Sequence, residues 1–469
     1  MRHFDLCVIG SGAGGQRAAI QAAKLGKRVC VVERQEVVGG AAINTGTIPS
    51  KALREAVLMA TGQRVAMATE TSFAQGRGID MRKLMTSCQT VIKAEIEIVR
   101  NHFAANDICL LNGRGQFRDA NTIDVIGEHS MQTVTADKIV VAVGTAPARS
   151  PSIPFDGVNV ITSDELLHLH TLPRSIIVVG GGVIGSEYAS MLSLLGVKTT
   201  LVEGRNRLLE FVDAEIIEAF QYHARQGGMT LRMGEKVVKI SLVEAAIGPR
   251  SNDGIMVEAM LESGKSLRAD ALLYCIGRQG STEGLGLENA GLSADSRGRI
   301  VVNDNYQTKV PNIYAVGDVI GFPALASTSM EQGRIAACSM FGERFDRFDE
   351  LLPYGVYTIP EISMVGWTEE RLTAEGVPYE SGIAHYREIA RGQLLGDDIG
   401  MLKMLIHQES HAVLGVHAIG TGATELIHIG QTAIAFKATA EYFVNTVFNY
   451  PTLAECYKVA ALNGLNKLR

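Results

Sequence analysis

The sequence lacks the features that would support a disulfide framework, a membrane span or a nucleic-acid surface. Its seven cysteines are scattered over 469 residues and no two have CxxC spacing, which argues against an oxidised scaffold or a zinc site. No apolar run reaches the roughly 20 residues of a transmembrane helix. The net charge of -6 gives no general attraction to nucleic acid.

What remains is the composition of a globular protein, with 46% hydrophobic and 20% charged residues and length for about three domains. The first apolar strand begins at about Phe4, which leaves no room for a signal or transit peptide, so we expect a cytoplasmic protein. Glu425 and His428 have the ExxH spacing of some metal sites, but such sites need a second copy. We therefore expect helix packing there and no metal.

Glycine, by contrast, is abundant and recurs in two matching motifs. The sequence GSGAGG at 10–15 follows the apolar run Phe4–Ile9, and GGGVIG at 180–185 follows Ile176–Val179. An acid closes a second apolar strand 23 residues after the first glycine of each motif: Glu33 in one case and Glu203 in the other. A glycine-rich turn would explain one such motif, but two copies in the same strand–turn–helix–strand–acid frame indicate two dinucleotide sites.

The chemistry of these motifs is that of a Rossmann-type βαβ unit. Glycines permit a tight turn and close approach of the backbone to a pyrophosphate, which then faces a helix N-terminus. The acid accepts hydrogen bonds from a ribose. Two dinucleotides on one chain suggest that electrons pass between them.

The order of the elements predicts an α/β fold of three domains. Residues 1–150 and 277–345 form a discontinuous dinucleotide-binding domain, because strand character returns at Ile300–Asp318 after an excursion through a second such domain at 151–276. A long helical stretch is expected over Lys51–Ala105. Residues 346–469 mix strands, including Lys403–Ile406 and Ala412–His417, with helices.

One segment carries a resemblance to a known family. GGAAINTGTIPSK at 39–51 resembles the redox segment GGxCxxxxCxPSK of the flavoprotein disulfide reductases, a group that includes dihydrolipoamide dehydrogenase and glutathione reductase. The resemblance covers the whole chain and includes the Gly317-Asp318 motif and the C-terminal segment YPTLAE at 450–455. It is closer still to the soluble pyridine nucleotide transhydrogenases in TIPSKALR at 47–54, YAVGDVIG at 314–321 and FNYPT at 448–452.

The chain departs from the disulfide reductases at the groups that perform thiol chemistry. Ala42 and Thr47 stand at the two cysteine positions, and Tyr450 stands where the acid–base histidine is found. Transhydrogenases share the threonine and tyrosine but usually keep the first cysteine. A disulfide substrate needs a thiolate and a base, whereas hydride transfer between nicotinamide and flavin needs only stacking, positioning and charge stabilisation.

The resemblance implies FAD in the first domain, with Lys51 near flavin N5, Thr47 packed under the ring and Asp318 on the ribityl chain. The helix that follows Pro323 would point its N-terminus at the N1/O2 edge, where reduced flavin is negative. The expected FAD-binding residues are Gly10, Gly12, Gly14, Gly15, Glu33, Gly40, Thr47, Lys51, Gly144, Gly317, Asp318, Leu325, Ala326 and Ser327.

The second motif is expected to bind NAD(H) and NADP(H) as substrates. Glu187, which pairs with the lysine in the resembled family, is a candidate catalytic residue together with Lys51. Glu203 suits the 2′-hydroxyl of NAD, while Arg205 and Arg207 suit the 2′-phosphate of NADP. The expected residues are Gly180, Gly182, Val183, Ile184, Gly185, Glu187, Glu203, Arg205, Arg207 and Gly277.

The resulting hypothesis is an FAD-dependent transhydrogenase that exchanges hydride between NADPH and NAD⁺, in either direction and by a ping-pong sequence. An NAD(P)H diaphorase or quinone reductase remains the alternative, and a non-enzymatic flavin-binding sensor a remote one. By resemblance, residues 346–469 form an α+β dimerisation domain that carries Tyr450 and Glu455 to the partner's flavin. We expect a homodimer or higher homo-oligomer.

Overall fold

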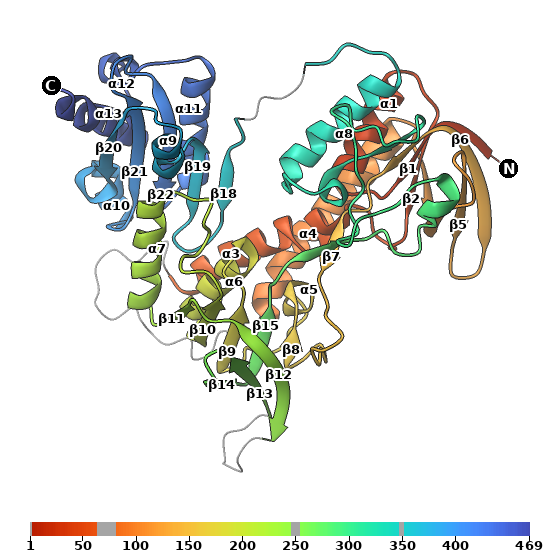
Figure 1. Ribbon diagram of the computed structural model, residues 1–469, viewed down its shortest axis with the longest axis horizontal. Helices are drawn as coiled ribbons and strands as arrows, with labels where there is room; N and C mark the ends of the chain where they lie inside the picture. Colours follow the sequence, from red (N-terminus) through yellow and green to blue (C-terminus); the bar gives the residue numbers. More distant parts are fainter. Residues whose placement is uncertain (1, 63–80, 245–253, 347–350) are drawn as a thin grey trace. The chain divides into compact units, whose positions relative to one another are not determined.

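The computed structural model describes residues 2–62, 81–244, 254–346 and 351–469 (Figure 1). The chain forms two compact units. The first contains residues 1–53, 84–150 and 276–348, and the second contains 54–83, 151–275 and 349–469. Two of the boundaries, at 53/54 and 83/84, fall within the helices α3 (Thr47–Ala60) and α4 (Met81–Ala105).

The first unit is built on a seven-stranded sheet whose central strands are parallel. Its order is β3-β2-β1-β6-β5-β4, and β17 also pairs with β6. A separate antiparallel pair joins β7 to β16. The strands are β1 (Arg2–Ile9), β2 (Val29–Glu33), β3 (Cys109–Asn112), β4 (Arg114–Phe117), β5 (Thr122–Ile126), β6 (Met131–Val141), β7 (Thr145–Pro147), β16 (Arg278–Gly280) and β17 (Ile313–Ala315).

Both faces of this sheet are buried, which explains its continuous apolar strands. Leu6 and Val8 of β1 belong to one core cluster, while Cys7 and Ile9 belong to the other. Cys7 and its register partner Cys30 are fully buried, as expected of a thiol acting as a small hydrophobe.

Two helices lie side by side over one face of this sheet, α1 (Ala13–Lys24) and α8 (Ala326–Met340) (Figure 1). A Cβ placed on Gly333 would lie 2.1 Å from the carbonyl oxygen of Gly14, so the two backbones approach closely because both residues are glycine. This contact fixes the N-terminal turn of α1 against the flank of α8.

The second unit begins with a five-stranded parallel sheet of order β11-β10-β9-β15-β8, which has α6 and α7 as crossovers. An antiparallel sheet, β12-β13-β14, is inserted before β15. The elements are β8 (Val160–Ile161), α5 (Ser163–Leu166), β9 (Ser175–Val179), α6 (Val183–Leu194), β10 (Lys198–Glu203), α7 (Ala214–Gln226), β11 (Thr230–Met233), β12 (Val237–Glu244), β13 (Ile255–Leu261), β14 (Ser266–Ala269) and β15 (Ala271–Tyr274).

The same unit ends in an antiparallel sheet of order β18-β19-β22-β21-β20, packed against helices. Figure 1 shows these elements in blue. They are β18 (Tyr354–Val356), β19 (Ile362–Gly366), α9 (Glu369–Ala374), β20 (Tyr379–His385), α10 (Ala390–Leu395), β21 (Met401–His407), β22 (Val413–Ile419), α11 (Ala423–Ala435), α12 (Ala440–Asn445) and α13 (Glu455–Lys467).

One expectation about local structure needs correction. The strand expected from Ile300 is wrong at its start, because only β17 forms, and the preceding segment closes turns through Asn303 and Gln307 instead. The helix expected over 51–105 is described as α3 and α4, and residues 63–80 lie outside the described residues. Among the described residues, no helix is both long and apolar enough to cross a bilayer.

Candidate functional site

The first glycine motif forms a strand–turn–helix junction between β1 and α1. Gly10 has a φ of +105°, and a Cβ on Gly15 would lie 2.0 Å from the Gly10 carbonyl oxygen. Gly12 caps α1 without any side-chain hydrogen bond. A Cβ on Gly12 would have its nearest neighbour at 3.9 Å. The first turn of α1 therefore keeps backbone N–H groups that no side chain caps, the arrangement that suits a pyrophosphate.

Glu33 joins this turn to the segment at 39–51. Its Oε2 accepts from the backbone N–H of Ser11 at 3.0 Å and from the Ser11 hydroxyl at 2.6 Å. The Ser11 Oγ in turn accepts from the backbone N–H of Gly39 at 2.9 Å. Oε1 accepts only from Gln35 N–H among the hydrogen bonds of the described residues. A carboxylate has about four acceptor positions, so Glu33 has capacity for a ribose hydroxyl.

The segment that resembles the redox motif packs directly on the glycine turn. A Cβ on Gly40 would lie 2.7 Å from the Cα of Gly12, which ties the short helix α2 (Gly40–Asn44) to that turn. Ala42 lies on α2, and Thr47 begins α3. Lys51 is half-buried on α3, where its Nζ donates to the Ser50 hydroxyl at 3.3 Å.

Asp318 lies in the short 3-10 helix Gly317–Ile320 that follows β17, close to Thr145 at the start of β7. Its Oδ2 accepts from the Thr145 hydroxyl at 3.2 Å, and that hydroxyl accepts from Arg278 Nε at 2.7 Å. The Gln332 side chain of α8 accepts from Gly317 N–H at 2.8 Å. Gly144, Gly277 and Gly317 all have positive φ. Leu325, Ala326 and Ser327 form the N-terminus of α8, which has no side-chain cap.

The second glycine motif repeats the geometry of the first. Gly180 has a φ of +106°, and a Cβ on Gly185 would lie 1.9 Å from the Gly180 carbonyl oxygen. Gly182 caps α6 without a side-chain bond, and nothing lies within 4 Å of where its Cβ would be. Val183 and Ile184 begin α6. The sequence-predicted correspondence of the two motifs therefore extends to their local structure.

Glu203 differs from Glu33 because the Arg205 side chain donates to both of its carboxylate oxygens. Its Oε2 accepts from Gly181 N–H at 2.6 Å and from the Arg205 guanidinium at 3.0 Å. Its Oε1 accepts from the backbone N–H and from Nε of Arg205, both at 2.9 Å. Burial alone would raise the pKa of Glu203, but the hydrogen bonds from Arg205 and Gly181 outweigh it and the pKa is lowered. All four acceptor positions are in use.

Glu187 lies on α6 and is buried, with 3% of its surface exposed. Its Oε1 accepts from the backbone N–H of Tyr357 at 2.9 Å, and the next turn of α6 makes a similar contact between Ser190 Oγ and Ile359 N–H at 3.1 Å. These bonds attach α6 to the segment 357–359, which follows β18.

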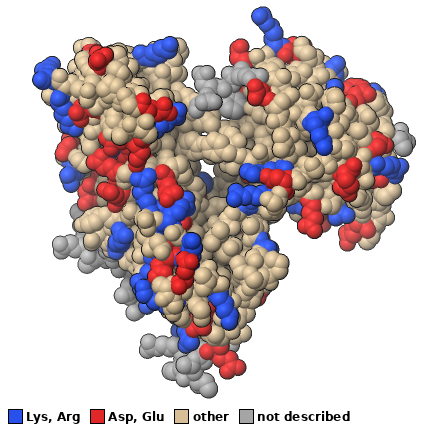
Figure 2. All heavy atoms as spheres, in the orientation of Figure 1, with Lys and Arg blue, Asp and Glu red and all other residues tan. Residues whose placement is uncertain are grey.

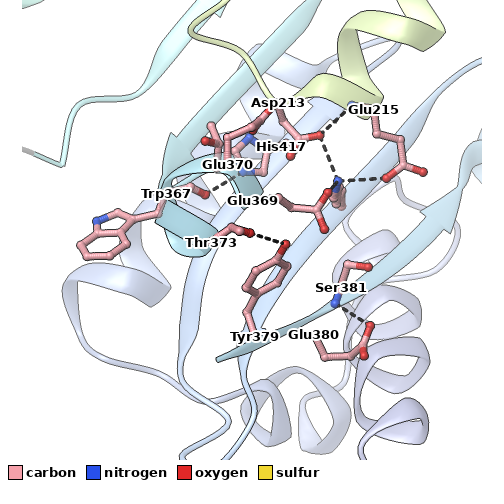
Figure 3. A network of polar contacts seen from close by, with 12 residues as sticks. Asp213, Glu215, Trp367, Glu369, Glu370, Thr373, Tyr379, Glu380, Ser381 and His417 are labelled. Atoms are coloured by element: carbon pink, nitrogen blue, oxygen red, sulfur yellow. Dashed lines mark hydrogen bonds and ion pairs between the residues drawn. The ribbon is translucent and has the colours of Figure 1, made fainter. Parts of the chain in front are cut away.

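A network beyond the predicted site connects the segment 204–213 to the C-terminal residues. Arg207 pairs with Glu370 of α9 at 2.8 Å. Lys403 of β21 is fully buried and lies 3.0 Å from Asp213, 2.9 Å from Glu215 and 2.6 Å from Glu369. Figure 3 labels these three acids and draws them close together.

The three carboxylates around Lys403 are close enough to hold a metal ion, and a lysine occupies that position instead. Sequence reasoning missed both Lys403 and Glu370. A lone lysine inside the apolar strand MLKMLIH was the available signal for Lys403, since a buried charge requires partners. Nothing near Glu370 in the sequence indicates its distant partner.

Positive and negative side chains are interspersed on the face drawn in Figure 2. Acidic side chains gather over the C-terminal elements at the left of this view, next to lysines and arginines.

Comparison with known proteins agrees with the two-motif architecture. The chain matches the family model of the pyridine nucleotide-disulphide oxidoreductases over residues 4–333 and that family's dimerisation domain over 352–461. It belongs to this family of oxidoreductases. Within it, the chain is 50% identical over its whole length, and 98% of the relative's, to a soluble pyridine nucleotide transhydrogenase from Mycobacterium bovis. It is 44% identical to one from Vibrio cholerae, with 99% of both chains covered.

Solved structures show the same fold at lower identity. LpdA from Mycobacterium tuberculosis superposes with a TM-score of 0.86 at 25% identity, covering 98% of this chain and 99% of its own. The HOCl-induced flavoprotein disulfide reductase RclA from Escherichia coli, in its Cu(II) complex, superposes with a TM-score of 0.87 at 26% identity and the same coverage.

Proposed function

We propose that this protein is an FAD-dependent soluble NAD(P)⁺ transhydrogenase that passes hydride between NADPH and NAD⁺. FAD, when bound, supplies a ring that accepts a hydride from a reduced nicotinamide and returns it to an oxidised one. The observation that carries the proposal is the pair of matching glycine turns, combined with a redox segment that contains no sulfur.

FAD would be held by the first unit. The open N-terminus of α1 suits the pyrophosphate, Glu33 has an acceptor position for the ribose, and Asp318 suits the ribityl chain. The uncapped N-terminus of α8, at Leu325, Ala326 and Ser327, would stabilise negative charge on the reduced ring. The domain boundaries we propose are 1–150 with 277–345 for FAD, 151–276 for NAD(P) and 346–469 for dimerisation.

Lys51 would act near flavin N5, where its positive charge favours the electron-rich reduced ring. Thr47 would pack under the ring and take no part in the chemistry. With Ala42 and Thr47 in place of two cysteines, no thiolate can attack a disulfide.

The nicotinamide nucleotides would bind in turn at the second motif. Gly180, Gly182 and Gly185 shape the turn, Val183 and Ile184 offer the first N–H groups of α6, and Gly277 follows β15. Glu187 would line the nicotinamide pocket. Glu203 would receive the ribose of NAD(H), and the loop that carries Arg205 and Arg207 would receive the 2′-phosphate of NADP(H).

The active form would be a cytoplasmic homodimer or a multiple of it. The dimerisation-domain match over 352–461 supports this, as do the exposed large hydrophobic side chains of Phe436, Val447 and Tyr450. Tyr450 and Glu455 would reach the partner's flavin. Light scattering at assay concentration should show a dimer or a multiple, and a fully active monomer would refute this part.

The function itself is tested with purified, FAD-loaded protein, NADPH and thio-NAD⁺. We expect thio-NADH to form, with parallel double-reciprocal plots as the two nucleotides are varied, because they use one site in turn. Reduction of quinones or dyes without any thio-NADH would instead establish the diaphorase alternative.

A further inference from the structure

The segment 204–213 between β10 and α7 is held on both of its sides. On the inner side, Leu208 and Val212 are buried, and Leu209 N–H donates to the Gly181 carbonyl at 3.4 Å. On the outer side, Arg207 and Asp213 reach residues of the C-terminal sheet and α9. The loop that would read the 2′-phosphate is therefore supported by residues outside the nucleotide-binding fold.

Two neighbouring acids in the first turn of α9 provide this support. Glu369 lies 2.6 Å from Lys403, which in turn binds Asp213, the N-cap of α7. Glu370 lies 2.8 Å from Arg207. The buried Lys403 centre therefore holds α9 and the start of α7 together, and this places Glu370 opposite Arg207.

The two arginines of the loop are bound in different ways. Arg205 donates two hydrogen bonds to Glu203 and lies 3.7 Å from the Glu210 carboxylate, and 45% of its side-chain surface is exposed. Arg207 is 27% exposed and is bound at both ends of its guanidinium, by Glu370 and by the Glu210 carbonyl at 2.9 Å.

We propose that Glu370 is a specificity-determining residue, which withholds Arg207 from the 2′-phosphate so that Arg205 alone exchanges between Glu203 and that phosphate. The inference rests on the proposed use of this loop for both nucleotides. It explains how one loop serves both. Arg205 leaves Glu203 for the phosphate of NADP(H), and the ribose of NAD(H) displaces Arg205 from Glu203.

The physical argument is a competition for guanidinium groups. Both arginines must break charge-assisted hydrogen bonds before they can bind a phosphate with the same donors, since Arg205 donates to Glu203 and Arg207 donates to Glu370. Arg205 is the more exposed of the two, and when its guanidinium leaves, Glu203 keeps the backbone N–H groups of Gly181 and Arg205. Removal of Glu370 frees the Nη1 donors of Arg207 and removes one negative charge beside the loop. Both effects should strengthen the binding of a nucleotide that carries a 2′-phosphate. Neither effect should change the binding of a nucleotide without that phosphate.

The test uses the full-length, FAD-loaded protein and calorimetric titration with adenosine 2′,5′-bisphosphate and with 5′-AMP. Glu370→Ala should tighten binding of the bisphosphate about fivefold and leave 5′-AMP within about twofold. In an Arg207→Ala background the same substitution should have little effect, because the released arginine is absent. In an Arg205→Ala background it should restore part of the lost bisphosphate affinity.

Glu258→Ala is the matched control, since Glu258 also pairs with an arginine, Arg268, at 2.8 Å, but in the three-stranded sheet. If Glu370→Ala does not fold, Glu370→Gln removes the charge and retains an acceptor. Equal changes for both ligands, or a gain that persists without Arg207, would overturn the inference alone. Wild-type protein that binds 5′-AMP and not the bisphosphate would contradict the proposed dual use of the loop.

Discussion

Lys403 and His417 lie directly opposite each other in the antiparallel pair β21–β22, and both are fully buried. Lys403 is surrounded by Asp213, Glu215 and Glu369, whereas His417 uses Nε2 for a 2.9 Å contact with the Trp367 carbonyl. The lysine and the histidine beside it therefore have different hydrogen-bond partners. Lys403 links the C-terminal sheet to α7 and α9, whereas His417 bonds to the residue that follows β19 of the same sheet.

Lys403→Met should destabilise the protein by about 3–5 kcal/mol, because it leaves the buried carboxylate of Asp213 without its cation. Methionine keeps the apolar part of the side chain, so the loss of packing is small. Chemical denaturation followed by circular dichroism measures the change. Lys265→Met is the control, since Lys265 is an exposed partner of Glu235 and its loss should matter little. Equal stabilities of the two variants would contradict the importance of the buried centre.

The stabilisation of the fold by Lys403 should also depend on pH in a defined way. Burial alone would lower the pKa of Lys403, but hydrogen bonds and attraction from Glu369, Asp213 and Glu215 outweigh it, so the pKa is raised. A raised lysine pKa stabilises the fold fully below the unfolded value of about 10.4 and loses effect as the pH rises through the folded value. The difference between wild type and Lys403→Met should be constant from about pH 6 to 9.

His417 should make the protein sensitive to mild acid. Burial lowers the pKa of His417 despite the opposing attraction of Asp213. The unfolded chain therefore binds a proton near the ordinary histidine value of about 6.5 that the folded chain resists, so stability falls as the pH drops from about 7 to 5. His417→Gln should flatten this part of the profile. His129→Gln, at an exposed position, should not.

Anaerobic titration of the FAD-loaded protein should consume two electrons per flavin. Ala42 and Thr47 leave no sulfur to store a second pair, so no thiolate-to-flavin charge-transfer band should appear. An end point of four electrons would show that another redox centre takes part.

Lys51→Ala should slow flavin reduction by NADPH about tenfold or more, which equals a barrier increase of at least roughly 1.4 kcal/mol. The reason is the lost charge near the reduced ring. Stopped-flow absorbance measures the rate, and the retained yellow colour shows that FAD stays bound. Lys239→Ala, at an exposed position on β12, is the control. An unchanged rate for Lys51→Ala would reject its role.

Arg205→Ala combined with Arg207→Ala should raise the KM for NADPH about tenfold or more relative to the KM for NADH. The double variant removes Arg205, which binds the phosphate, and Arg207, which could replace it. The charge-assisted hydrogen bonds that Arg205 donates contribute about 1.5–3 kcal/mol each, and exposure of the loop reduces this. Steady-state assays with each nucleotide measure the two constants. Equal effects on NADH and NADPH would indicate that the phosphate is recognised elsewhere.

The sequence alone predicted those features whose cause is local. Gly10, Gly15 and their counterparts Gly180 and Gly185 are required by a turn that no side chain fits, so the glycine pattern predicts the turn directly. The apolar strands are equally evident, because both faces of a parallel sheet are buried. The loss of thiol chemistry at Ala42 could also be seen from the sequence alone.

The tertiary structure decided which distant residues meet. Glu203 and Glu33 occupy equivalent positions in the sequence, yet only the structure shows that Arg205 fills the acceptor positions of Glu203. Glu370 and Lys403 gave no sign of their partners, since Arg207 and Asp213 lie more than 150 residues away in the chain. Local rules of turns and hydrophobic pattern act over a few residues, whereas ion pairs depend on chain segments brought together only by folding.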